Sequence, residues 1–309
     1  MKKNFIIISL ISCIFSAAWA APVPLADPFV LLHEGTYYAY GTLSPDGIVV
    51  FSSQDLKSWK YEGHALQKGN VWGEKWFWAP EVYKTDDGFL MYYSADTFLC
   101  AAKAASPLGP FTQKEKKQML PENKAIDHTL LIDTDGKPYI YFSRLLKGNV
   151  IWSAELGNDL ITIKRKTMKH AIAAQQDWEK RKGLINEGSA VLKHDGKYYL
   201  TYSGNDYQSP FYGIGYAVSD SPQGPWKKYE NNPVFQLPGN LVGVGHHSFF
   251  KDKAGKLRVV FHAHNSKEKI HPRLMYITTA EFRDGKLYIS PDYITPQFTN
   301  PEDLPWSVK

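Results

Sequence analysis

The sequence is nearly free of cysteine. Cys13 and Cys100 are the only two in 309 residues, and Cys13 lies within an apolar N-terminal stretch. A domain that begins after that stretch keeps Cys100 alone, with no partner for a disulfide. A disulfide-stapled scaffold is therefore excluded, and the chain has to be stabilised by its own hydrophobic core.

A strong excess of one charge sign is also missing. The chain carries 36 Lys and Arg against 31 Asp and Glu, and without Lys2 and Lys3 the balance is 34 to 31. So mild a positive charge gives no reason to expect a nucleic acid or an anionic membrane surface as partner.

Long apolar runs are confined to the first 20 residues, MKKNFIIISLISCIFSAAWA. Two lysines, an apolar run and the small-x-small sequence Ala18-Trp19-Ala20 predict a secretory signal peptide over residues 1–20. The run is too short and wrongly flanked for a membrane span. Leu10-Ile-Ser-Cys13 offers a lipoprotein cleavage site as the alternative. We therefore expect an exported protein, periplasmic or extracellular, with no membrane span.

Long helical periodicity is absent as well, and only residues 173–182 have a convincing helical pattern. The remainder reads as short strands rich in Tyr, Phe, Val and Ile, separated by Asp-Gly and Gly-Lys turns. Aromatic residues are abundant, with 9 Trp, 19 Tyr and 16 Phe. Such side chains bury much area in a core, and they also form flat platforms for ligands.

Five hairpins share one frame, in which a polar residue precedes an apolar run and a turn glycine follows. The leading residues are Asp27, Glu81, Asp127, Glu187 and His246, and the turn glycines are Gly35, Gly88, Gly136, Gly196 and Gly255. Four strands per unit and five units are typical of a β-propeller, against the alternative of a β-sandwich with accidental similarity. We predict an all-β fold, a single five-bladed β-propeller over residues 21–309 with four antiparallel strands per blade.

Propeller geometry gives the leading residues a meaning. The innermost strand of each blade runs along the central axis, so the leading residues converge at one mouth of the channel. Carboxylates placed that close shift each other's pKa values. Glycosidic bond cleavage uses such a set, since one carboxyl group protonates the leaving oxygen while another activates water or attacks the sugar.

Several phrases in order make the likeness specific. They are Ala26-Asp27-Pro28, Ser53-Gln-Asp-Leu-Lys-Ser-Trp59, Trp78-Ala-Pro-Glu-Val82, Ile126-Asp127, Asn186-Glu187-Gly188 and Gly245-His246. With these phrases the chain resembles glycoside hydrolase family 43 from Ala26 to about Ile289. The resemblance implies a five-bladed propeller enzyme that acts on arabinose- and xylose-containing glycans of the plant cell wall, polysaccharide or oligosaccharide.

The resemblance also implies a catalytic trio. Asp27 corresponds to the general base that holds the attacking water, Glu187 to the general acid, and Asp127 to the carboxylate that raises the pKa of the acid and orients it. The implied reaction inverts the anomeric carbon. Each residue has a structural alternative: a turn cap for Asp27, an ion pair for Asp127, and a surface position for Glu187.

Two further axial residues, Glu81 and His246, are expected to have roles other than catalysis. Glu81 is interpreted as mainly structural, a hydrogen-bond acceptor near the channel. His246 resembles the family histidine that faces the channel, where many members hold Ca²⁺ or Na⁺ mostly through water. The alternative is a buried histidine bonded to the backbone. No cofactor is expected to be required.

Four residues are predicted to bind substrate. Arg273 resembles an arginine of blade five that reaches the sugar pocket, and a guanidinium offers several donors in fixed geometry. At least one of Phe77 and Trp78 is expected in the pocket wall. Phe29 is predicted to share a strand face with Asp27, because side chains two residues apart lie on the same face.

The chain also departs from the family's two-domain β-xylosidases. It stops near the end of blade five, without a C-terminal β-sandwich, and has Asp284-Gly-Lys-Leu287 where many of them have Asp-Gly-Trp-Pro. An α-L-arabinofuranosidase, a compact exo-xylosidase, an endo-acting enzyme and a galactofuranosidase all stay open. A non-catalytic glycan-binding propeller and a propeller acting on fructans or mannosides are the competing classes. We expect a monomer.

Overall fold

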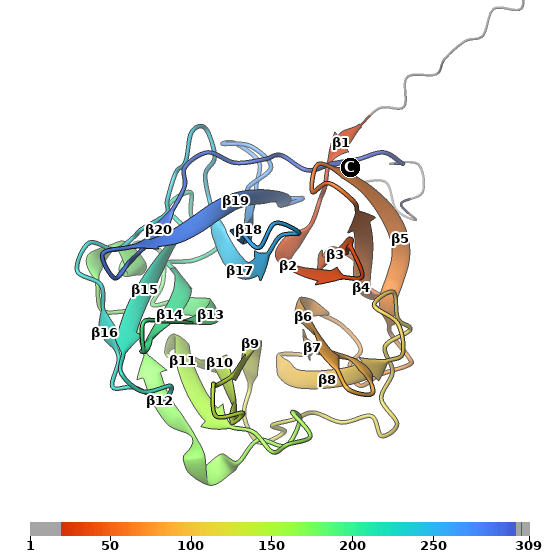
Figure 1. The fold of residues 1–309 in the computed structure, drawn as a ribbon, viewed down its shortest axis with the longest axis horizontal. Coiled ribbons are helices and arrows are strands. Elements are labelled where there is room, and N and C mark those ends of the chain that lie inside the picture. The colour runs from red at the N-terminus through yellow and green to blue at the C-terminus, as the bar shows by residue number, and fades with distance from the viewer. Residues whose placement is uncertain (1–19, 301–303, 305–309) are drawn as a thin grey trace, which may run out of the picture.

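Five small antiparallel sheets surround a central axis in the computed structural model, which describes residues 20–300 and residue 304 (Figure 1). This arrangement confirms the predicted all-β five-bladed propeller. The predicted signal peptide, except for Ala20, lies outside the described residues. Within the described part of the chain, none of the helices is long and apolar enough to cross a membrane.

Each blade runs outward from an inner strand. The inner strands are β2 (Ala26–His33), β6 (Trp78–Thr85), β9 (Ala125–Ile132), β13 (Asn186–His194) and β17 (Gly245–Lys251). The second strands are β3 (Thr36–Thr42), β7 (Gly88–Ala95), β10 (Pro138–Leu146), β14 (Lys197–Gly204) and β18 (Leu257–Ala263). The outer strands are β4 (Gly47–Ser53), β5 (Ser58–Gln67), β8 (Phe98–Ala104), β11 (Gly148–Glu155), β12 (Lys169–Ile172), β15 (Gly213–Ser219), β16 (Lys227–Lys228), β19 (Leu274–Arg283) and β20 (Lys286–Ile289).

The ring is closed at blade one, whose sheet takes up both ends of the described chain. β21 (Gln297–Phe298) pairs with β5 in parallel and with β1 (Ala21–Pro22) in antiparallel orientation. The buried ring of Phe298 packs edge-on against Phe51. The first and last blades are therefore tied together by the same sheet.

Blade two departs from the expectation of four strands. Its sheet contains only β6, β7 and β8, and the outer position is reduced to a bridge between Lys103 and Thr112. The segment that precedes Thr112 contains Pro107 and Pro110. Proline has no N–H, so these two positions cannot donate to a ladder.

The helix expected over residues 173–182 is also not there. A single 3₁₀ turn, η2 (Asp177–Lys180), takes its place, and a second short turn, η1 (Arg165–Thr167), precedes it. Glu179 is fully buried and accepts the N–H groups of Gln175 and Gln176, while Lys228 donates to its carboxylate. This buried ion pair fixes the segment locally and overrides its helical propensity.

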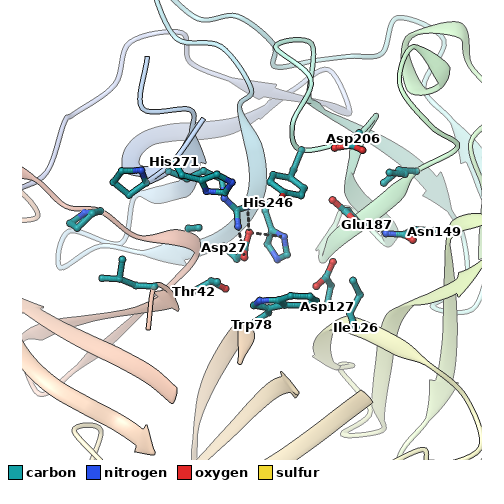
Figure 2. A pocket seen from close by; sticks show the side chains of 17 residues that line it. Asp27, Thr42, Trp78, Ile126, Asp127, Asn149, Glu187, Asp206, His246 and His271 are labelled. Atoms are coloured by element: carbon teal, nitrogen blue, oxygen red, sulfur yellow. Dashed lines mark hydrogen bonds and ion pairs between the residues drawn. The ribbon is translucent and has the colours of Figure 1, made fainter. Parts of the chain in front are cut away.

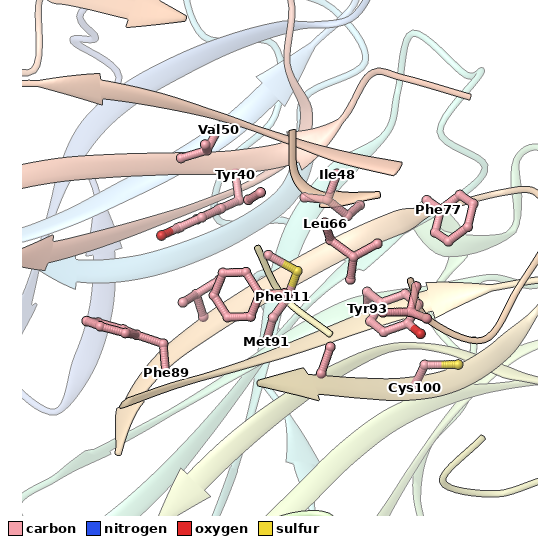
Figure 3. Close-up of a cluster of buried hydrophobic side chains, with 14 of the residues drawn as sticks. Tyr40, Ile48, Val50, Leu66, Phe77, Phe89, Met91, Tyr93, Cys100 and Phe111 are labelled. Carbon is pink, nitrogen blue, oxygen red and sulfur yellow. The ribbon is translucent and has the colours of Figure 1, made fainter. Parts of the chain in front are cut away.

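The hydrophobic core lies between neighbouring blades. The cluster between blades one and two packs Tyr40 and Ile48 of the first sheet against Met91 of the second, with Phe111 from the connecting loop (Figure 3). Each fully buried side chain of this size stabilises the fold by about 1.5–3 kcal/mol. Four further clusters of the same kind fill the other contacts around the ring.

Every inner strand begins with a β-bulge. In each blade two residues of the inner strand oppose one of the second strand, and the first of the two has a left-handed backbone. These residues are Asp27 (φ 48°), Ala79 (φ 45°), Asp127 (φ 57°), Gly188 (φ 53°) and His246 (φ 45°). Bulges re-aim side chains, and they are common next to active sites.

The bulges correct the frame that the sequence suggested. Asp27, Asp127 and His246 are structurally equivalent, as expected. Glu187 lies one residue earlier, immediately before its bulge, and Glu81 lies immediately after its bulge. Counting back from the turn glycine missed this difference, because hairpin length and bulge position vary independently between blades.

Candidate active site

The bulges are held in place by hydrogen bonds between blades. In four of them the N–H of the left-handed residue donates to a side chain on the second strand of the preceding blade. The pairs are Ala79 to Thr42 Oγ1 (3.0 Å), Asp127 to Ser94 Oγ (3.1 Å), His246 to Ser203 Oγ (2.7 Å) and Asp27 to His262 Nδ1 (3.1 Å). In the fifth, the N–H of Gly188 bonds to the Asp127 carboxylate instead. Functional groups on these bulges are consequently held rigidly.

Three of the bulge residues, Asp27, Asp127 and His246, line a pocket of about 610 Å³ (Figure 2). Ala26, Asp27, Trp78, Ile126, Asp127, Glu187 and His246 line it from five different inner strands. Loop residues such as Asp206, Tyr207 and His271 form its walls. The volume is typical of a pocket that binds a small organic molecule.

Asp27 is surrounded by positive and potentially positive groups. Arg273 makes a bidentate ion pair with it, at 2.8 Å from Nη1 to Oδ1 and 3.3 Å from Nη2 to Oδ2. His246 Nδ1 lies 3.3 Å from Oδ1. Burial alone would raise the pKa of Asp27, but Arg273, His246 and His262 outweigh it and hold the pKa well below its usual range. Asp27 is therefore ionised near neutral pH.

Glu187 has no cationic partner of this kind. Its Oε1 accepts a hydrogen bond from the Tyr212 hydroxyl (2.9 Å) and its Oε2 one from Asn149 Nδ2 (2.6 Å). Burial raises the pKa of Glu187 to about 7, the charge of Asp27 adds to the rise, and the two hydrogen bonds oppose it. Glu187 therefore keeps a proton under conditions in which Asp27 does not.

Asp127 completes the set of buried carboxyl groups. Burial raises its pKa well above the usual value, and the charges of Glu187 and Asp27 raise it further, while the Gly188 N–H bond lowers it. Since Asp127 and Glu187 repel each other when both are charged, the two titrate as a pair rather than independently.

The predicted substrate residues divide into two groups. Arg273 and Trp78 line the pocket. The expectation that at least one of Phe77 and Trp78 lies in the pocket wall is met by Trp78. Phe77 lies in the core between blades one and two, where its ring stacks on Tyr93, so its predicted contact with substrate is corrected. Phe29 is corrected too, because the bulge after Ala26 breaks the two-residue period that put it on the face of Asp27. Its side chain lines the channel below the pocket.

His246 faces both the pocket and that channel. The channel space beside it is about 10 Å³, room for about one water molecule. Among the described residues no group of three or more His, Cys, Asp or Glu side chains is arranged to hold a metal ion. Glu81, on the same channel, accepts a hydrogen bond from Tyr83, and burial raises its pKa to about 8. Direct coordination of Ca²⁺ or Na⁺ does not fit these residues.

Three site residues had no usable signal in the sequence. Tyr212, directly before β15, and Asn149, on β11, donate hydrogen bonds to the Glu187 carboxylate. Neither residue belongs to a family phrase or to the hairpin frame. His262 likewise stands outside the family phrases and the hairpin frame. Its actual place is opposite Gly245 on β18, the position that holds a hydroxyl in the other four blades.

An ionised carboxylate and a protonated carboxyl group therefore share one pocket. This is the pair that hydrolysis of a glycosidic bond requires, with one group acting as base and the other as acid. On a five-bladed propeller, the fold and the site together define a glycoside hydrolase.

Comparison with known proteins agrees with that class. The profile of the glycosyl hydrolases family 43 matches residues 21–287, and the chain belongs to this family. It is thus a glycosidase. Its fold matches the crystal structure of an endo-1,4-β-xylanase from Bacteroides thetaiotaomicron VPI-5482 with a TM-score of 0.87 and 44% identity, covering 90% of this chain and 98% of the other.

Curated relatives are more distant. The β-D-galactofuranosidase xynD of Aspergillus niger is 28% identical over 77% of this chain and 73% of its own length. The extracellular exo-α-(1→5)-L-arabinofuranosidase ArbA of Cellvibrio japonicus is 24% identical over 85% of each chain. The relatives therefore share the reaction type but differ in the sugar.

Proposed function

We propose that the protein hydrolyses O-glycosidic bonds in arabinose- or xylose-containing plant polysaccharides or oligosaccharides, with inversion at the anomeric carbon. Asp27 is the general base, Glu187 the general acid, and Asp127 the carboxylate that modulates and orients the acid. The enzyme works as an exported monomer.

One observation carries this proposal: two buried carboxyl groups of the same pocket have pKa values shifted in opposite directions. The pKa of Asp27 is held well below its usual range by Arg273, and that of Glu187 is raised to about 7 by burial. A base must be ionised and an acid protonated at the same pH, and this arrangement supplies both near neutrality.

The reaction then follows in one displacement. The Glu187 carboxyl donates its proton to the glycosidic oxygen as the bond to the anomeric carbon breaks. Asp27 accepts a proton from the water that attacks the opposite face, and the product is a hemiacetal of inverted configuration. Inversion requires room for that water, so the two carboxyl groups are predicted to lie roughly 6.5–9.5 Å apart.

The substrate class is argued from relatives rather than from the carboxylates. A structural relative at 44% identity is an endo-1,4-β-xylanase, which supports xylan as the substrate. Extracellular arabinan-degrading relatives support arabinan and export. The galactofuranosidase relative supports galactofuranosides as the second candidate.

A substrate panel tests the proposal. Aryl β-xyloside, aryl α-L-arabinofuranoside and aryl β-galactofuranoside are assayed beside xylan, arabinoxylan and branched arabinan, and NMR records the anomer released first. We expect release of pentose with inversion. In folded Asp27→Asn and Glu187→Gln variants, kcat falls by about 10²–10⁴-fold.

Three outcomes would contradict it. Unchanged turnover in Asp27→Asn or Glu187→Gln contradicts the catalytic role of that residue. A first product with the same anomeric configuration as the substrate contradicts the inverting mechanism. Folded protein that binds these glycans and hydrolyses none of the panel is a glycan-binding propeller instead.

A further inference from the structure

Trp76 is the most exposed tryptophan of the described chain beside the pocket, with 45% of its surface accessible. Its backbone has φ 59°, a left-handed conformation that a bulky side chain adopts only with strain. Neither property helps the chain to fold. A strained residue that exposes a large apolar ring is instead typical of a site where a ligand contacts the protein.

The residues on both sides fix the position of Trp76. The carbonyl of Lys75 accepts the N–H of Asp96 at 2.9 Å. Phe77 is buried and stacks on Tyr93, with ring centroids 6.2 Å apart. The indole of Trp76 is consequently held outward by an anchored backbone and does not belong to a mobile loop tip.

The exposed indole is continuous with the catalytic pocket. Trp76 and Trp78 are stacked, with centroids 5.6 Å apart and an angle of 20° between the rings. Trp78 in turn lines the pocket together with Asp27 and Asp127 (Figure 2). Two parallel indoles therefore lead from the pocket to the surface.

The chemistry of this surface suits a sugar. An indole offers a flat, electron-rich face, against which the C–H groups of a sugar ring pack well. The ammonium group of the exposed Lys75 lies 4.1 Å from the centroid of the Trp76 ring. A flexible lysine can move aside from the ring, and its ammonium then becomes a donor to sugar hydroxyl groups.

We propose that Trp76 is a platform for a sugar unit of an oligosaccharide or polysaccharide, outside the catalytic pocket and on the same glycan chain as the sugar inside it. The proposal rests on the proposed function, and it narrows the substrate class to glycans of several units. Lys75 is the polar contact of the same site.

The test compares substrates that reach the platform with substrates that do not. For wild type and Trp76→Ala, kcat/KM is measured on xylotetraose or 1,5-linked arabinotetraose and on the aryl glycoside of the same single sugar. The ratio of the two kcat/KM values is expected to fall about tenfold in Trp76→Ala, through KM, as the loss of one stacked ring predicts. Trp76→Phe should recover part of the ratio.

Tyr288 supplies a matched control. It is 44% exposed on β20, at the outer edge of blade five, and the Arg283 guanidinium lies 4.4 Å from its ring centroid. Tyr288→Ala should leave kcat/KM on both substrates, and the ratio of the two values, unchanged. An unchanged ratio in Trp76→Ala, or an equal loss on both substrates, overturns the platform.

Failure of the proposed function is distinguishable from failure of the platform. If wild type hydrolyses none of these compounds, affinity electrophoresis in gels containing xylan or arabinan decides the matter. Retardation of wild type that is lost in Trp76→Ala supports the platform without catalysis. Equal migration of the two proteins overturns it.

Discussion

Asp27 and Glu187 differ in their neighbours more than in their burial. Both are buried carboxyl groups of one pocket. Asp27 receives the guanidinium of Arg273, while Glu187 receives only neutral donors from Tyr212 and Asn149. A charged partner outweighs the cost of desolvation and two neutral hydrogen bonds do not, so the same chemical group is ionised in one place and more readily protonated in the other, as the proposed base and acid require.

The Tyr212 hydroxyl should set the basic limb of the pH profile. In the proposed mechanism Glu187 acts while protonated, and its pKa of about 7 places that limb near neutrality. Tyr212→Phe removes a donor that favours the ionised form, so the pKa of Glu187 rises and the limb of kcat/KM moves to higher pH. The ring itself, stacked on His262, is retained. The measurement is kcat/KM on an aryl glycoside across pH.

Tyr199→Phe is the control for that profile. Tyr199 is equally buried, but its hydroxyl donates to the carbonyl of Gly285, in the turn between β19 and β20 of blade five. Its removal should leave the limb where it is. A basic limb that stays fixed, or moves to lower pH, in Tyr212→Phe contradicts the assigned role.

Sequence reasoning predicted that the three carboxyl groups share one site, and all three line the pocket, but it did not predict the contacts that tune them. Asp27, Asp127 and Glu187 stand in short recognisable phrases next to strand starts. The residues that tune them lie far away, with 246 positions between Arg273 and Asp27 and 38 between Asn149 and Glu187. Nothing local marks such a contact, because it forms only when the blades close into a ring.

At the scale of the element, the repeated bulge is the feature that builds the site. A left-handed backbone at a non-glycine residue costs about 1–3 kcal/mol, and Asp27, Ala79, Asp127 and His246 all adopt one. The N–H bonds between blades offset part of that strain. The inner strand therefore holds the side chains of the pocket through the bulge and not through its regular pleat.

Gly188 is the bulge position most sensitive to change. Its φ is 53°, and a Cβ there would lie 3.0 Å from Cγ and 3.1 Å from Nδ1 of the His246 ring. Gly188→Ala should destabilise the protein by about 1–3 kcal/mol. Because Glu187 precedes it, kcat/KM should also fall by about 10-fold to 100-fold. Urea unfolding and steady-state kinetics measure the two effects.

Gly196→Ala is the control that introduces backbone strain without a contact with His246. It lies in the hairpin turn of blade four with φ 76°, and no atom lies within 4 Å of an added Cβ. Gly196→Ala should cost about 1–2 kcal/mol from the left-handed backbone alone and leave kcat/KM unchanged. Full activity in Gly188→Ala contradicts the role given to the bulge.

At the scale of the whole molecule, the channel makes stability depend on pH. The axis collects buried carboxyl groups and buried histidines, including His128, His247 and His262, whose pKa values burial lowers to about 4, 3 and 3. In acid the histidines of the unfolded chain bind protons, whereas the same histidines in the folded protein stay neutral, so stability falls as the pH is lowered. Above about pH 4.5 the unfolded chain releases protons that the buried carboxyl groups of Glu187 and Glu81 keep until about pH 7 and pH 8, so stability also falls as the pH rises through this range.

Glu81→Gln isolates the loss of stability that accompanies rising pH. The ordinary pKa of this group is 4.5 and burial raises it to about 8 in the folded protein, so its contribution is complete below pH 4.5 and is lost as the pH rises through 8. Compared with wild type, Glu81→Gln should gain on the order of 3–5 kcal/mol between pH 4.5 and pH 9. Urea unfolding at the two pH values measures the gain.

Glu230→Gln controls for the loss of one negative charge, because Glu230 is exposed. Its stability difference from wild type should be the same at both pH values. A Glu81→Gln curve parallel to that of wild type contradicts a protonated Glu81 in the channel.

Turn signals, aromatic-rich strands and the repeated hairpin frame are local features, and they were enough to predict five blades and the convergence of three carboxyl groups, Asp27, Asp127 and Glu187, on one site. Tertiary structure alone decided the bulge register, which displaced Glu187 and Glu81 from the common frame and took Phe29 off the face of Asp27. It also decided the protonation of each carboxyl group, since a pKa depends on burial and on charges that only ring closure brings within a few ångströms.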